Sequence, residues 1–145
     1  GDGIWKGKAG RPEMDEQEWE HILQIKTAGR DDSHSDGEHH PYEPTDYGVL
    51  ERLANSGYIG KKDTLVDYGS GKGRVSFFLA YQTRCQDIGV EYDRRLWEKA
   101  LANGQTAASR RRVTFVLADA VEYEILPLFA GDDDREKILV LRLRD

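Results

Sequence analysis

Residues 66–75 of this chain read VDYGSGKGRV, with three glycines and a lysine in a short stretch that contains an aspartate. The apolar run TLVDY at 64–68 predicts a strand, and the apolar residues after Gly73 predict a helix that reaches about Thr83. A glycine-rich turn between a strand and a helix is a common cofactor site, because the backbone can approach the ligand closely. The spacing of the glycines indicates which cofactor is bound.

A phosphate-binding P-loop is excluded by this spacing. Such a loop has the form G-x-x-x-x-G-K-[ST], in which the lysine reaches the phosphates and the following hydroxyl binds magnesium. Here Gly71 and Lys72 are followed by Gly73, and Val66 stands where the first glycine is required. The Gly-Lys pair therefore does not belong to a P-loop.

The dinucleotide-binding pattern G-x-G-x-x-G is disfavoured as well. Counted from Gly69 and Gly71, its third glycine falls at Arg74. The stretch instead reads G-x-G-x-G, with Asp67 two positions before the first glycine. This spacing favours a cofactor without phosphate groups and leaves a NAD-dependent oxidoreductase as a weaker alternative.

The stretch DYGSGKGR at 67–74 resembles motif I of the class I S-adenosylmethionine-dependent methyltransferases, [DE]-x-G-x-G-x-G. The resemblance continues at GVEYD, where this family places an acidic residue at the end of the second strand to hold both ribose hydroxyls, here Glu91. It also reaches LADA at 117–120, where Asp119 resembles the acidic residue that accepts a hydrogen bond from the adenine amino group. The resemblance covers about residues 42–140 and implies methyl transfer from S-adenosylmethionine to an unidentified acceptor.

The chemistry of these residues agrees with the roles that the resemblance implies. An ionised carboxylate accepts two hydrogen bonds at once, so Glu91 can bridge two hydroxyls and Asp119 can recognise an amino group. Open parallel sheets bind ligands at the carboxyl ends of their strands, where all of these residues are expected. The predicted cofactor-binding residues are Tyr42, Thr45, Asp67, Gly69, Ser70, Gly71, Gly73, Glu91, Tyr92, Asp119 and Ala120.

Tyr42 and Thr45 belong to the segment HPYEPT at 40–45. Some branches of the same family have a Tyr-x-x-Thr or Tyr-x-Pro-Thr element here that contacts the methionine end of the cofactor. From the residues alone, Thr45 is equally well the N-terminal cap of a helix. No catalytic residue is assigned, and no metal site is expected, because the histidines at 34, 39 and 40 lack a metal-binding spacing.

The fold class implied is α/β: a Rossmann-like αβα sandwich with a parallel sheet of strand order 3-2-1-4, preceded by an N-terminal helical arm. Helices are predicted over 13–26, from a cap at Thr45 to 55–57, from about Gly73 to Thr83, and from a cap at Asp93 to Gly104. The third of these precedes a strand at 88–92. The fourth has an apolar stripe made of Leu96, Trp97, Ala100 and Leu101. Further strands are predicted at 113–118 and 137–143. Residues 1–44 form the arm and an acidic loop, and residues 45–145 form the cofactor-binding domain.

Composition narrows the class of protein. The 145 residues have a net charge of −6, and residues 1–45, with 5 Lys/Arg and 11 Asp/Glu, account for all of it. This balance argues against a nucleic-acid acceptor and favours a small molecule or a protein. Arg110-Arg111-Arg112 is interpreted as a solvated turn before a strand. No apolar run approaches the roughly 20 residues of a membrane helix. The lone Cys85 is interpreted as a buried apolar residue and fits a cytoplasmic protein.

The chain departs from the family after the fourth predicted strand. A short Asn/Asp-Pro-Pro-aromatic motif near the transferred methyl is usual there, whereas residues 138–145 read ILVLRLRD. We therefore expect a domain truncated after this strand, with the cofactor half present. A non-catalytic S-adenosylmethionine-binding module is the main alternative to an enzyme. An open sheet edge would also favour a homodimer.

Overall fold

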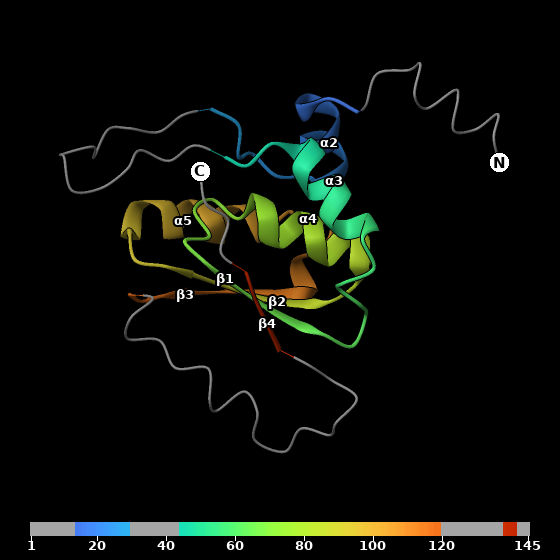
Figure 1. The fold of residues 1–145 in the computed structure, drawn as a ribbon. Coiled ribbons are helices and arrows are strands. Elements are labelled where there is room, and N and C mark those ends of the chain that lie inside the picture. Colours follow the sequence, from blue (N-terminus) through green and yellow to red (C-terminus); the bar gives the residue numbers. More distant parts are fainter. Residues whose placement is uncertain (1–13, 30–43, 120–137, 142–145) are drawn as a thin grey trace, which may run out of the picture.

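The structure is a computed structural model, and it describes residues 14–29, 44–119 and 138–141 (Figure 1). Four parallel strands form one sheet in the order β3-β2-β1-β4. They are β1 (Thr64–Tyr68), β2 (Gln86–Glu91), β3 (Val113–Leu117) and β4 (Ile138–Leu141). Strands and helices alternate from β1 to β3, so the predicted α/β class is confirmed.

The carboxyl ends of the strands meet at one edge of the sheet because all the strands are parallel. Asp67 of β1 pairs with Gly89 of β2, and Glu91 at the end of β2 pairs with Leu117 at the end of β3. Side chains on a strand alternate between faces, so Asp67, Gly89 and Glu91 share one face of the sheet. That register brings the predicted site residues of separate strands together.

Two helices, α4 (Arg74–Thr83) and α5 (Arg94–Asn103), link the strands and cover one face of the sheet (Figure 1). Phe77 and Phe78 of α4 are fully buried. Asp93 caps α5 by accepting hydrogen bonds from two backbone N–H groups, as predicted. Leu101 does not belong to the buried stripe, since it is 40% exposed. The second helical layer of the predicted sandwich would lie outside the described residues.

The N-terminal arm forms a shorter helix than the predicted 13–26. Helix α2 covers Glu16–Leu23, and a capping box between Asp15 and Glu18 fixes its start. It ends because Gln24 adopts a left-handed conformation with φ 58°. The chain then continues without helix, and Ile25 turns into the core with 4% of its surface exposed.

Helix α3 (Tyr47–Asn55) begins at a different cap from the predicted one. The side chain of Asp46 accepts a hydrogen bond from the Gly48 N–H at 2.9 Å, so Asp46 and not Thr45 is the N-terminal cap. A carboxylate is at least as good a cap as a threonine hydroxyl, and Asp46 stands one residue closer to the helix. Tyr47 and Leu50 face the core, whereas Val49 is 38% exposed.

The arm shares its core with the rest of the domain. Trp19 and Leu23 of α2 are buried in the same cluster as Leu50 of α3 and Phe78 of α4. The Trp19 ring meets the Phe78 ring edge-on, with centroids 4.8 Å apart. Figure 1 shows α2 and α3 stacked over α4, on the side away from the sheet. Cys85 is fully buried, as predicted, and burial raises the pKa of its thiol to about 11.

The arginine cluster at 110–112 and the length of the helices bear on two further predictions. Arg110–Arg112 form a 3-10 turn, η1, directly before β3, in agreement with the predicted turn. No helix within the described residues has both the length and the apolar content needed to span a lipid bilayer.

Gly89 provides a test of the packing under the glycine loop. A Cβ atom at Gly89 would lie 2.7 Å from Ser70 Cβ and 2.7 Å from Phe115 Cδ1. We expect Gly89→Ala to lower the free energy of unfolding by about 1–3 kcal/mol, because the crowded neighbours must shift. Urea unfolding followed by tryptophan fluorescence measures the change. The matched control is Gly60→Ala, whose new methyl would have its nearest neighbour at 3.6 Å; equal losses in both variants would contradict the packing argument.

Candidate functional site

The glycine loop between β1 and α4 is a tight turn in which three glycines have positive φ. Gly69, Gly71 and Gly73 have φ of 78°, 59° and 100°, a region that disfavours other residues. The N–H groups of Gly69 and Ser70 both donate to the Val90 carbonyl, at 2.7 and 3.2 Å. Nothing lies within 4 Å of a Cβ placed on Gly69. The loop is thus fastened to β2 and is open at Gly69, whereas residues 70–73 are buried and Gly73 packs against Phe77 and Phe115.

Glu91 joins the end of β2 to this loop. One carboxylate oxygen accepts the Gly71 N–H at 2.7 Å, and the other accepts the Asp93 N–H at 3.0 Å. The side chain is 4% exposed. Burial raises the pKa of Glu91 above its ordinary value, and the hydrogen bonds from the backbone oppose that increase. Each oxygen keeps a second lone pair for a further hydrogen bond.

The end of β3 lies beside the end of β2. The Ala118 N–H donates to the Glu91 carbonyl at 3.0 Å, which continues the ladder by one residue and places Asp119 directly after it. Asp119 is exposed, and Tyr92 is 52% exposed. The sheet edge therefore brings together the glycine loop, Glu91 and Asp119. Two predicted residues, Tyr42 and Ala120, lie outside the described residues.

Thr45 and Ser70 take different places around the loop. Thr45 is half-buried, and its carbonyl accepts a hydrogen bond from Arg74 at 2.9 Å. Ser70 is 6% exposed, and its hydroxyl has no hydrogen-bond partner among the described residues. Thr45 is thus held through its backbone carbonyl and not through its side chain. Ser70 packs against Gly89.

Asp67 does not point into the solvent at the sheet edge. It is 4% exposed, shares a sheet face with Asp87 of β2, and lies under Ser76 of α4. Burial raises the pKa of Asp67 well above its ordinary value, and the nearby Asp87 and Glu91 carboxylates raise it further. Burial likewise raises the pKa of Asp87 to about 7, and the Ser76 hydroxyl opposes both shifts.

These buried groups lack full hydrogen-bond partners within the part of the chain that the structure describes. Neither oxygen of Asp87 has one, and the same is true of Asp67 Oδ2 and Ser76 Oγ. An unpaired buried carboxylate is stable mainly in its protonated form. The sheet face beneath α4 therefore holds two buried acids whose pKa values lie above the ordinary range, that of Asp87 at about 7.

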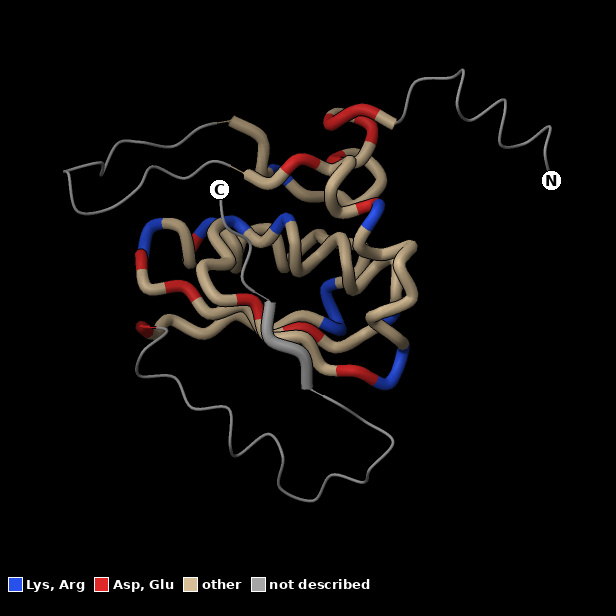
Figure 2. The backbone as a smooth tube through the Cα atoms, in the orientation of Figure 1, with Lys and Arg blue, Asp and Glu red and all other residues tan. Residues whose placement is uncertain are grey.

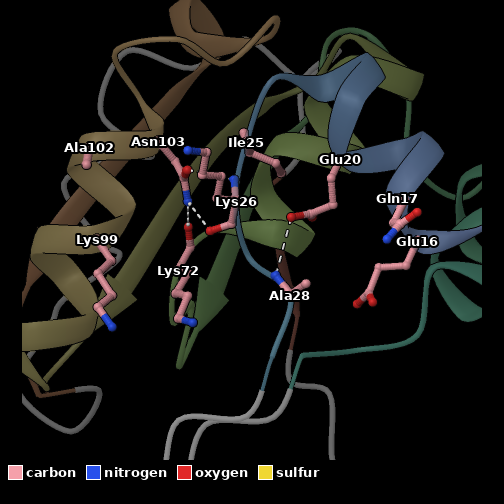
Figure 3. A pocket seen from close by; sticks show the side chains of 10 residues that line it. All are labelled: Glu16, Gln17, Glu20, Ile25, Lys26, Ala28, Lys72, Lys99, Ala102 and Asn103. Atoms are coloured by element: carbon pink, nitrogen blue, oxygen red, sulfur yellow. Dashed lines mark hydrogen bonds between the residues drawn. The ribbon is translucent and has the colours of Figure 1, made fainter.

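An open pocket of about 560 Å³ lies beside the glycine loop (Figure 3). Its walls come from α2, the segment 25–28, Lys72 of the loop, and α5. Asn103 of α5 joins two of these walls, because its side-chain amide accepts from the Lys26 N–H at 2.8 Å and donates to the Lys72 carbonyl at 3.0 Å. Figure 3 shows the Lys72 and Lys99 side chains extending in the same direction. Glu91 and Asp119 do not line this pocket.

Comparison with solved structures identifies proteins of the same fold. An RNA methyltransferase from Salinibacter ruber, solved with S-adenosyl-L-homocysteine, matches with 31% identity and a TM-score of 0.54 over 57% of this chain and 54% of its own. A SAM-dependent methyltransferase from Thiobacillus denitrificans, also solved with S-adenosyl-L-homocysteine, matches with 21% identity and a TM-score of 0.51 over 56% of this chain and 33% of its own. YjhP from E. coli matches with 21% identity and a TM-score of 0.51 over 59% of this chain and 35% of its own.

These matches confirm the Rossmann-like α/β fold. The 31% identity to the Salinibacter RNA methyltransferase agrees with the resemblance to S-adenosylmethionine-dependent methyltransferases. The described chain spans about half the length of the Salinibacter protein and about a third of the other two. No model of a protein family matches the sequence, and no curated protein matches it.

Three structurally important residues escape the sequence analysis. Arg74 stands in the motif, but nothing in its neighbourhood predicts that it is 3% exposed and bonded to the distant arm. Asp87 precedes an apolar run, so the sequence favours an exposed residue at the start of a strand. Asn103 precedes a glycine, so the sequence favours an exposed residue at the end of a helix. In the described residues, no group of three or more His, Cys, Asp or Glu side chains is arranged to hold a metal ion.

Asp87 makes the stability of the fold depend on pH. Its pKa is about 7 in the folded protein and near 3.8 in an unfolded chain, so the folded state binds the proton more tightly. Its contribution is fully present below about pH 4 and is lost as pH rises through about 7. The full loss is on the order of 4 kcal/mol. We expect Asp87→Asn to abolish this loss, which occurs between about pH 4 and pH 7, as measured by urea unfolding between pH 4 and 8.

The control is Glu98→Gln, which changes an exposed carboxylate of α5. This variant should keep the pH dependence of the wild type. A stability of Asp87→Asn that falls with pH as steeply as that of the wild type would show that Asp87 is not the titrating group.

Proposed function

We propose that this chain forms the cofactor-binding part of a methyltransferase that uses S-adenosylmethionine. The observation that best supports the proposal is the hydrogen bond from the Gly71 N–H to the buried Glu91 carboxylate, with Asp119 at the end of the next strand. This arrangement offers the exposed backbone of Gly69 and two carboxylates along one sheet edge. The Salinibacter relative, at 31% identity, was solved with the product form of this cofactor.

Each described residue has a proposed part in binding. The exposed backbone at Gly69 would lie against the ribose and methionine portions, where a side chain would obstruct them. Ser70, Gly71 and Gly73 are buried and would shape the turn on which the cofactor lies. Glu91 would accept both ribose hydroxyls with its remaining lone pairs, and Asp119 the adenine amino group. The exposed ring of Tyr92 would lie beside the ribose. Thr45 would contact the amino-acid end.

For Asp67 two roles are open from its chemistry: orienting the glycine loop, or meeting the cofactor ammonium through water. Its burial beneath α4 supports the first. Roles for Tyr42 and Ala120, which lie outside the described residues, remain those that the resemblance implies.

The cofactor supplies a methyl group on a positively charged sulfur, which an acceptor nucleophile displaces in line, leaving S-adenosylhomocysteine. The residues of this chain align the donor by fixing its adenosine at Glu91 and Asp119 and its remainder over the glycine loop. Alignment of donor and acceptor supplies much of the acceleration in such a reaction. No side chain is assigned as a base.

The acceptor class, the location and the assembly state are proposed from composition, from Cys85 and from the edge of the sheet. The acidic composition favours a small molecule or a protein as acceptor, and the buried thiol of Cys85 fits a cytoplasmic protein. Strand β4 pairs with β1 and stands at an edge of the described sheet. A homodimer that joins copies through this edge would be detected as a doubled mass in sedimentation.

Removal of the Glu91 carboxylate tests the binding site. We expect Glu91→Ala to weaken binding of S-adenosylhomocysteine by about 1.5–3 kcal/mol, the scale of hydrogen bonds to a charged group. Titration calorimetry measures the affinity, with NAD as the negative ligand and Glu98→Ala as the control variant. Undiminished affinity in the Glu91 variant, or NAD binding as tight as that of S-adenosylhomocysteine, would refute the assignment.

Methyl transfer separates an enzyme from a binding module. We expect the purified chain to move tritium from methyl-labelled S-adenosylmethionine to an acceptor in a cell extract. Replacement of Gly71 by tryptophan should abolish the labelling, because its side chain would block the loop. Tight cofactor binding without any labelled acceptor would favour the non-catalytic module.

A further inference from the structure

Arg74 ties the glycine loop to the two ends of the arm region. It directly follows Gly73, opens α4 and is 3% exposed. Its Nε donates to the Thr27 hydroxyl at 2.8 Å, and one terminal nitrogen donates to the Thr45 carbonyl at 2.9 Å. One side chain thus holds the segment after α2 and the segment before α3 against the start of α4.

The other terminal nitrogen of Arg74 meets the acids of α2, which Figure 2 shows in red. It donates to Glu16 at 2.5 Å and lies 3.7 Å from a carboxylate oxygen of Glu20. That Glu20 oxygen also accepts from the Tyr47 and Thr27 hydroxyls, both at 2.6 Å. The guanidinium carbon lies 4.3 Å from the centre of the Tyr47 ring. Such a buried cation is stable only with all these partners in place.

The topology determines which half of the cofactor would lie near this network. The strand order places β2 between β3 and β1, with Asp119 after β3, Glu91 ending β2, and the glycine loop after β1. A ligand whose adenine meets Asp119 and whose ribose meets Glu91 therefore runs along this edge toward β1. Its amino-acid half lies over the glycine loop, where Arg74 begins α4.

We propose that Arg74 is a positioning residue that fixes the arm and the start of α3 for recognition of the amino-acid half of the cofactor. The inference rests on the proposed function. Arg74 does not contact the ligand; it holds Thr45 and the segment at Thr27 in place beside the loop. Docking of the arm and binding of this half of the ligand are then coupled, and each favours the other.

Two ligands separate this role from a general structural one. S-adenosylhomocysteine contains the amino-acid half, whereas 5′-methylthioadenosine has the same adenosine and sulfur without it. We expect Arg74→Lys to lower the affinity for S-adenosylhomocysteine by at least about fivefold and the affinity for 5′-methylthioadenosine by less than about twofold, as measured by titration calorimetry. Lysine keeps the charge but cannot donate to three acceptors in a fixed fork.

A second variant keeps the test valid if Arg74→Lys does not fold. Thr27→Val retains the shape of the side chain but removes the hydroxyl that bonds both Arg74 and Glu20. It should show the same selective loss, and Thr27→Ser, which keeps the hydroxyl, should restore wild-type affinity. Arg52→Lys, at an exposed position of α3, is the control for the arginine replacement.

Each outcome bears on a separate claim. Equal weakening of the two ligands, or unchanged affinity for S-adenosylhomocysteine in folded Arg74 and Thr27 variants, overturns the positioning role and leaves the proposed function intact. Failure of the wild-type chain to bind either ligand overturns the proposed function, and the positioning role with it.

Discussion

The hydrogen bond between the Gly71 N–H and the Glu91 carboxylate is the interaction on which the site depends. It spans 2.7 Å inside the protein and joins the loop after β1 to the end of β2. Bonds from an amide to a carboxylate are stronger than neutral ones, and burial protects this one from water. The loop can therefore hold three left-handed glycines in a fixed conformation while the backbone at Gly69 stays exposed.

The same sheet face holds more negative charge than the hydrogen bonds compensate. Glu91 has two backbone donors, whereas Asp87 has no partner within the described residues. The buried cation of this helix, Arg74, is engaged with the acids of α2 on the opposite side of α4. Protonation of the unpaired acids is therefore the least costly way to bury them. Buried polar groups without partners are a departure from the usual rules of folding that is often found at functional sites.

The sequence predicts well those features that depend on local pattern. Strands β1 to β4, helix α4 and the Asp93 cap follow from apolar runs, glycine spacing and side-chain chemistry at helix starts. It fails where tertiary contacts decide: α2 ends early at the left-handed Gln24, after which Ile25 packs in the core, and Leu101 is exposed although it continues an apolar stripe. The strand ends of the site are predictable, since parallel strands bring them to one edge. The Arg74 network is not, because its partners lie far away in the sequence.

Net charge is a poor guide to the surface that an acceptor meets. Of the 27 acidic residues in the chain, Asp63, Asp67, Asp87 and Glu91 are at most 4% exposed. Glu20, with 12% of its side chain exposed, is bonded to Thr27 and Tyr47 and lies near Arg74. These acids contribute to the formal charge of −6 but little to the field outside the protein. The acidic excess that bears on the proposed acceptor class is therefore carried by exposed acids, such as Glu98 and Asp119.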